Sequence, residues 1–186
     1  MTFITAETNI NGALEKVGLI PDVIPNDISP STLLQIEFPK SSKDVALGNQ
    51  LSPQDASEQP KVSFVAPESS DYYTLVMTDP DAPSAHDRKF GPWRHWVVVN
   101  ISGSNIENSL TKAENQHTPY VGPGPGENTG VHRYTFLLYK QLKGGNQTFK
   151  PMEHEQREYR RKFDIPAFVA ENELELVSVN FFTCPT

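Results

Sequence analysis

Two aspartates stand at the end of a strongly apolar stretch, in the segment Thr78-Asp79-Pro80-Asp81-Ala82-Pro83-Ser84. Carboxylates this close together raise the pKa of one of them unless hydrogen-bond donors or cations compensate. Such a pair could orient a histidine or accept a cationic group. Asp and Pro are also common turn residues, so a capped turn without a ligand is the simpler alternative.

Two histidines could be the partners of these carboxylates. His95 opens the apolar segment 95–101, and period-2 alternation places Trp93 on the same face. His132 and Tyr134 share a face in the segment 132–140, which follows the loop Gly122-Pro123-Gly124-Pro125-Gly126. Taken singly, a histidine is more often a satisfied, partly buried side chain, and a Gly/Pro loop is usually only a loop. The interpretation of these segments as a binding site rests on the combination of the two aspartates, the two histidines and the Gly/Pro loop.

These residue types are suited to holding an oxyanion. Imidazole and backbone N–H groups can donate to an anion, glycine lets the backbone approach a ligand closely, and an ionised carboxylate can only accept. We therefore expect Asp79 and Asp81 to orient His95 or His132, or to receive an ammonium group. A headgroup that carries both ammonium and phosphate would satisfy both the carboxylate acceptors and the N–H donors. The sequence predicts a binding protein that is not an enzyme and has no metal or other cofactor.

Two catalytic alternatives use the same residues. Two histidines with carboxylates could bind zinc or Fe(II) for metal-assisted hydrolysis, but no tightly spaced pair such as HExxH is present. A Ser–His–Asp hydrolase is disfavoured because the chain lacks a Gly-x-Ser-x-Gly segment and Ser84 has no distinguishing context. Cys184 has no base beside it in the sequence, which argues against a catalytic thiol.

The hydrophobic pattern predicts a mainly β protein, a two-sheet antiparallel β-sandwich-like fold with a few short peripheral helices. Strands are expected at 32–38, 45–47, 61–65, 72–78, 95–101, 132–140 and 174–182. Helices are expected at 8–18 and 165–172, and Asp164 is placed to cap the second one. The basic run Arg157, Arg160, Arg161 and Lys162 alternates with glutamates, which predicts a solvated face.

Composition narrows the possible partners. The chain of 186 residues predicts a single domain over 1–186, and it carries 16 basic and 23 acidic side chains for a net charge of −7. The phosphate backbone of nucleic acid repels an acidic protein, which gains no free energy from counterion release there, so no nucleic-acid partner is expected. One cysteine, no secretory signal and no apolar stretch near the roughly 20 residues of a membrane span predict a cytoplasmic monomer.

Taken together, the segments TLVMTDPDAPS, W-x-H-W-V-V-V-N and YVGPGPGENTGVHRYTFLLYKQ resemble the phosphatidylethanolamine-binding protein family. The flanking segments VALGNQL and LVSVNFF agree with the family more loosely. LVSVNFF, with no long extra helix expected after it, is similar to fungal members, including the serine carboxypeptidase Y inhibitor subgroup. The resemblance implies a small anion pocket formed by Asp79, Asp81, Pro83, Trp93, His95, Val121, Gly122, Gly124, Pro125, His132 and Tyr134.

The same resemblance implies specific features of function and backbone. It implies a regulatory protein that binds a phosphate-like or phospholipid-headgroup anion and inhibits a serine carboxypeptidase. The N-terminal arm 1–8, which is uncharged up to Glu7, is a candidate for entering the enzyme's cleft. The alternative is modulation of kinase signalling or headgroup sensing without protease inhibition. Family members use cis bonds beneath the pocket, which predicts a cis peptide at Ala82–Pro83 or Gly91–Pro92. Gly126 and Phe90 depart from a proline and a tyrosine that are usual in the family.

Overall fold

The protein is built around a five-stranded antiparallel sheet in the order β6-β5-β4-β7-β8. The computed structural model describes the backbone from residue 3 to residue 186, and the side chains from residue 9 onward. The strands of this sheet are β4 (Tyr72–Asp79), β5 (Trp93–Ser102), β6 (Gln116–Thr118), β7 (His132–Gln141) and β8 (Leu174–Cys184). The strands on which the sequence places the site residues, β4, β5 and β7, are therefore neighbours at the centre of one sheet.

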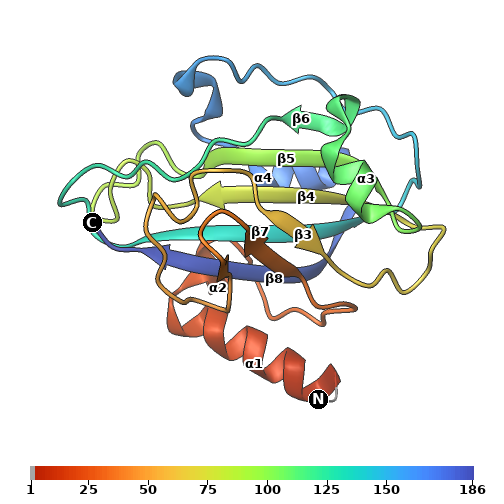
Figure 1. Ribbon diagram of the computed structural model, residues 1–186, viewed down its shortest axis with the longest axis horizontal. Helices are drawn as coiled ribbons and strands as arrows, with labels where there is room; N and C mark the ends of the chain where they lie inside the picture. The colour runs from red at the N-terminus through yellow and green to blue at the C-terminus, as the bar shows by residue number, and fades with distance from the viewer. Residues whose placement is uncertain (1–2) are drawn as a thin grey trace.

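A second, smaller sheet packs in front of the first (Figure 1). It is antiparallel in the order β2-β1-β3, with β1 at Gln35–Phe38, β2 at Lys43–Asp44 and β3 at Lys61–Ser63. Ile36 and Phe38 point inward from β1 and meet Phe182 of β8 in one hydrophobic core. The rings of Phe38 and Phe182 make an edge contact, with centroids 5.9 Å apart. The predicted two-sheet, mainly β fold is confirmed.

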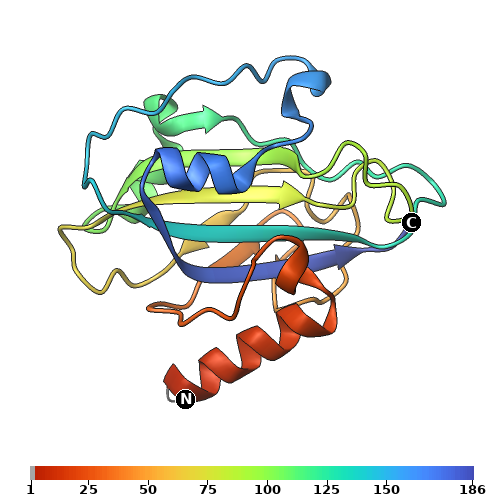
Figure 2. The ribbon, with the colours of Figure 1, turned by 180° about the vertical axis from the view of Figure 1, so that it is seen from behind.

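The opposite face of the large sheet is covered by helices (Figure 2). These are α1 (Phe3–Lys16), the short α2 (Leu19–Asp22) and α4 (Ile165–Glu171). Leu14 and Phe168 from these helices pack against Val76 of β4 and Val97 of β5 in a second core. Because the central strands are buried on both faces, their sequences read as continuous apolar runs and not as alternating ones.

Most predicted elements agree with the structure, and their ends differ. Asp164 caps α4 as predicted, accepting a hydrogen bond from the N–H of Ala167 at 3.0 Å. Two elements interrupt the stretch 102–118, which showed no regular pattern: helix α3 (Ile106–Thr111) and strand β6, with the 3-10 turn η1 (Ala113–Asn115) between them. The strand expected at 45–47 lies earlier, at β2.

The first helix begins earlier than the sequence predicted. It starts at residue 3, so most of the segment 1–8 that was expected to precede it is helical backbone. The side chains of 1–8 lie outside the described residues, as does the backbone of residues 1 and 2. Within the described part of the chain, no helix is long and apolar enough to cross a membrane.

Candidate anion-binding site

The centre of the site is a buried pair formed by Asp79, at the end of β4, and His132, at the start of β7. The Oδ2 atom of Asp79 lies 2.7 Å from Nδ1 of His132, and both side chains are almost fully buried. The other carboxylate oxygen of Asp79 accepts the N–H of Asp81 at 2.8 Å, which fixes the turn after the strand. The prediction that an aspartate orients a histidine is confirmed for this pair.

The second nitrogen of His132 is also used inside the protein. Its Nε2 atom lies 2.8 Å from Oγ1 of Thr129, and this hydroxyl oxygen lies 2.7 Å from the carbonyl oxygen of Gly126. The single hydroxyl hydrogen of Thr129 serves either the carbonyl of Gly126 or Nε2 of His132, and both contacts fix the position of this side chain. His132 therefore has both nitrogens engaged, and its role in this arrangement is to hold the Gly-rich loop against β7.

His95 has the free nitrogen of the site. Its Nδ1 atom donates to the carbonyl of Val121 at 2.6 Å, and the N–H of Val121 donates back to the carbonyl of His95 at 3.0 Å. Burial lowers the pKa of His95 to about 4, although the nearby carboxylate of Asp79 opposes this. The ring is therefore neutral at pH 7, with its hydrogen on Nδ1 and a lone pair on Nε2. No protein atom in the described residues hydrogen-bonds to that Nε2.

This protonation state differs from the donor role that the sequence predicted for both imidazoles. A neutral His95 accepts a hydrogen bond at Nε2 and cannot donate one there. A ligand must either bring its own proton to this nitrogen or bind together with protonation of the ring. A hydrogen phosphate, a phosphate monoester that retains one proton or an ammonium group can each supply that hydrogen.

Aromatic rings enclose His95. Its ring centroid lies 4.4 Å from that of Trp93 and 5.2 Å from that of Tyr134. Burial, and then the charge of Asp79, raise the pKa of Tyr134 far above its ordinary value. The phenol stays protonated at every accessible pH, and its hydroxyl has no protein partner in the part of the chain that the structure describes. It is a candidate donor for an anion.

Asp81 has a different environment from the one expected. Its Oδ2 atom accepts from the N–H and Nε of Arg133, at 3.0 and 2.8 Å, and its Oδ1 accepts from Nη2 of Arg133 and Nε of Arg88, both at 2.9 Å. Asp81 therefore orients no histidine. Asp22 of α2 contacts the same two arginines, at 2.8 Å for Arg133 and 2.7 Å for Arg88.

This cluster of two aspartates and two arginines joins the helical N-terminal region to the site. Burial alone would lower the pKa of Arg133, but its bonds to Asp81, then Asp22, raise it above the ordinary value. Burial likewise opposes ionisation of Asp22, yet Arg133 and Arg88 hold the pKa of that carboxyl low. Sequence reasoning missed both arginines. Arg133 alternates with His132 and Tyr134, so its side chain was expected on the opposite face of β7.

The Gly/Pro loop is tied down at its base by residues from distant segments. A Cβ atom on Gly122 would lie 2.6 Å from the carbonyl oxygen of Ala56, so only glycine fits there. The hydroxyl of Tyr120 donates to that same carbonyl at 2.7 Å. By contrast, a Cβ on Gly124 would meet nothing within 4 Å. Among the described residues, no protein acceptor takes the N–H of Gly122, Gly124 or Gly126, which leaves these amides as candidate anion donors.

Arg160, in the 3-10 turn η2 (Arg157–Arg160), braces this part of the site. Its Nη1 atom donates to three carbonyls, those of Arg94, His95 and Pro119, at 3.0–3.2 Å, and its guanidinium lies 5.5 Å from the ring centroid of Trp93. Arg160 is 5% exposed. The solvated face predicted for this basic run is therefore wrong at Arg160, and nothing in the spacing of the run distinguishes it.

The remaining predicted residues frame the opening. Ala82–Pro83 and Gly91–Pro92 are both cis, which confirms the backbone prediction, and Ile20–Pro21 is a third cis bond. Pro83 and Pro125 are partly exposed, and Val121 is exposed. Phe90, which stands where the family usually has tyrosine, lies under the guanidinium of Arg161 at 3.9 Å. No group of three or more potential metal ligands occurs in the described residues.

The fold and the site together define the class of protein. The profile of the phosphatidylethanolamine-binding protein family matches residues 41–182, and the chain belongs to that family. Among the relatives, the carboxypeptidase Y inhibitor of Saccharomyces cerevisiae is 33% identical over 206 aligned positions, which cover 92% of this chain and 93% of the inhibitor.

Solved structures agree with this assignment. A carboxypeptidase Y inhibitor in complex with its cognate proteinase superposes with a TM-score of 0.78 at 30% identity, covering 96% of this chain and 95% of the inhibitor. The phosphatidylethanolamine-binding protein of Plasmodium vivax also gives 0.78, at 28% identity, over 94% of this chain and 96% of that one.

Proposed function

We propose that this protein is a regulatory inhibitor of a serine carboxypeptidase that also binds a small phosphorylated ligand at the Asp79–His132 site. The observation that carries the inhibitory part is the similarity to a carboxypeptidase Y inhibitor over almost the full length of both chains. The described site supports a binding role, because its carboxylates and His132 are held by other protein groups and are not presented to a substrate.

The ligand-binding part of the proposal rests on the few polar atoms that the protein leaves free. These are Nε2 of His95, which can accept, the hydroxyl of Tyr134, which can donate, and the glycine N–H groups of the loop. One acceptor beside several donors matches an oxyanion that retains a single proton, such as a phosphate monoester. A free phosphorylated metabolite and a phospholipid headgroup share this chemistry.

Inhibition is tested by measuring hydrolysis of a peptide substrate by carboxypeptidase Y in the presence of the full-length protein. We expect loss of activity at micromolar protein or below. A form that lacks residues 1–8 tests whether this segment enters the enzyme, and it is expected to inhibit more weakly. Full enzyme activity at micromolar full-length protein would refute the inhibitory function, whereas equal inhibition by both forms would refute only the role of the segment.

Ligand binding is tested separately by NMR titration with phosphorylethanolamine, following the ring signals of His95. Tyr134→Phe removes one hydroxyl from the site and should weaken binding by about tenfold, the effect of one hydrogen bond to a charged ligand. Tyr139→Phe is the matched control, since Tyr139 lies on the same strand but packs in the other core. Equal affinities for the two variants, or no shift at millimolar ligand, would contradict the proposed pocket.

A further inference from the structure

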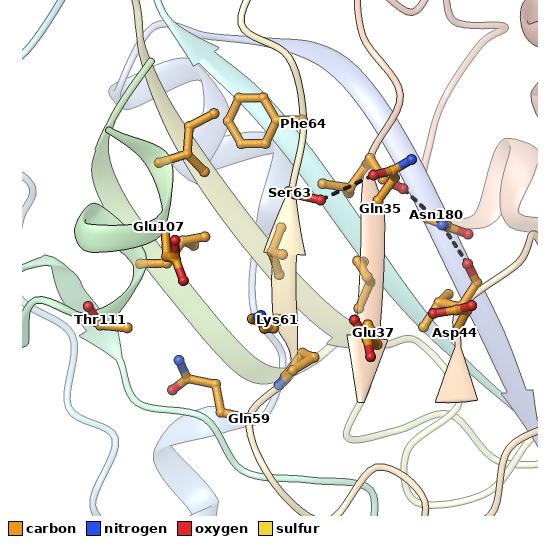
Figure 3. A pocket seen from close by; sticks show the side chains of 17 residues that line it. Gln35, Glu37, Asp44, Gln59, Lys61, Ser63, Phe64, Glu107, Thr111 and Asn180 are labelled. Carbon is orange, nitrogen blue, oxygen red and sulfur yellow. Dashed lines mark hydrogen bonds between the residues drawn. The ribbon is translucent and has the colours of Figure 1, made fainter. Parts of the chain in front are cut away.

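A groove unrelated to the anion site lies between strand β3 and helix α3 (Figure 3). Its volume is about 840 Å³, and its lining contains none of the residues predicted for the anion pocket. Apolar side chains form its floor, among them Val62 and Phe64 from the β3 side and Ile106 and Leu110 from α3. A hollow of this size with an apolar floor and a polar rim is typical of a binding site.

One wall of the groove is an open strand edge. The N–H of Val45 donates to the carbonyl of Ile36, so the backbone of Ile36 faces β2. In an antiparallel ladder, the backbone N–H and C=O of one residue point to the strand on one side, and those of the next residue point to the other side. Ile36 is paired in register with Val62 of β3. The N–H and C=O of Val62 therefore point away from β1. No other described segment hydrogen-bonds to them, so β3 presents unpaired backbone groups to the groove.

The rim of the groove is acidic. Glu37, Asp44 and Glu107 line it, against one cation, Lys61. Within the described residues none of these four side chains forms an ion pair within 4.0 Å, since the salt bridges of the protein involve other groups. The carboxylates are thus available to a cationic partner.

We propose that this groove binds an extended peptide segment of a partner protein, which adds as a strand to the free edge of β3. An open edge offers main-chain hydrogen bonds to any extended chain, while pockets and charges beside it select side chains. The apolar floor selects apolar side chains at alternate positions. The acidic rim selects lysine or arginine between them.

The probe is a fluorescein-labelled peptide, Val-Lys-Val-Arg-Val-Lys, and its matched control carries glutamate at the three basic positions. Binding to the full-length protein is followed by fluorescence anisotropy. We expect saturable binding of the basic peptide and none of the acidic one. Absence of binding by the basic peptide at millimolar protein, or equal binding of the two peptides, would overturn the proposal.

Backbone pairing is tested on the peptide, so that folding of the protein is not at risk. Two further peptides carry N-methyl groups on alternate residues, one set in each of the two frames. An added strand uses the N–H groups of one frame only, so one N-methylated peptide should lose binding and the other should keep it. Equal affinities for the two frames would exclude strand addition.

The acidic rim is tested with a double charge reversal, Glu37→Lys with Glu107→Lys. Both side chains are exposed, and the change should weaken the basic peptide by about tenfold, the effect of losing two surface ion pairs. The control is Glu114→Lys with Glu171→Lys, which makes the same change in net charge on exposed residues away from the groove. Equal losses in the two proteins would show attraction by overall charge and refute the site.

Discussion

Acidification should destabilise the protein through His95, because the folded protein keeps this ring neutral. Burial holds the pKa of His95 at about 4, against an ordinary value of 6.5. Between these two values the unfolded chain takes up a proton that the folded chain refuses. Stability is therefore unaffected by this group above about pH 6.5 and falls as the pH decreases toward 4.

The size of the effect follows from the two pKa values. Their difference of about 2.5 corresponds to about 3 kcal/mol once the pH lies below both of them. At about pH 4.5 the folded protein is still mostly unprotonated at His95, and the loss of unfolding free energy relative to about pH 7.5 is about 2–3 kcal/mol. This is a substantial part of the stability of an ordinary domain, which is about 5–15 kcal/mol.

The assay is urea unfolding of the wild-type protein and of His95→Gln at both pH values. Other groups titrate in this range too, including His117, whose pKa burial also lowers, and Asp22, whose pKa is low. Their contributions cancel in the difference between the two proteins, because both variants contain them. The wild type should lose about 2–3 kcal/mol more than the variant on acidification. A stability difference that stays constant between the two pH values would refute the neutral, buried state of His95.

Three further outcomes are expected. Asp81→Asn should lower the unfolding free energy in urea by about 3–5 kcal/mol, because Asp81 is the buried one of the two carboxylates that hold Arg133; a loss near zero would contradict this role of Asp81. Arg160→Met removes four hydrogen bonds to carbonyls, those of Arg94, His95, Pro119 and His154, and should cost about 2–4 kcal/mol in the same assay. Sulfate, which brings no proton to His95, should bind about tenfold more weakly than phosphate at pH 7 by calorimetry; tighter sulfate binding would exclude the acceptor role.

The sheet could be predicted because its central strands are unusually apolar. Residues 75–77 and 97–99 are buried on both faces, and that burial produces the continuous runs in the sequence. The convergence of Asp79, His95 and His132 could also be predicted, since each stands at the end of a central strand and neighbouring strands bring their ends together. The pairing of Asp79 with His132 follows from that geometry.

The groups that complete the site could not be predicted, because their partners are distant in sequence. Arg160 reaches carbonyls 41 to 66 positions away, and Asp22 reaches Arg133 across more than half of the chain. Thr129 is an ordinary loop threonine until the fold places its hydroxyl beside His132. Local alternation indicates which face a side chain occupies, but it carries no information about which segment covers that face.

The hydrogen-bond arrangement separates the residues that build the site from those available to a ligand. Asp79, Asp81 and His132 have the residue types most often associated with chemistry, yet their polar atoms are engaged by one another, by Thr129 and by arginines. The polar atoms without a protein partner among the described residues belong to His95, Tyr134 and the loop backbone. The hydrogen bonds of Asp79, Asp81 and His132 hold these groups in position. A change at Asp81 should therefore act on ligand binding through the geometry of the turn, whereas a change at Tyr134 should act on binding alone. On the proposed function, selectivity between phosphorylated ligands depends on the proton that the ligand brings to His95, since the protein supplies none there.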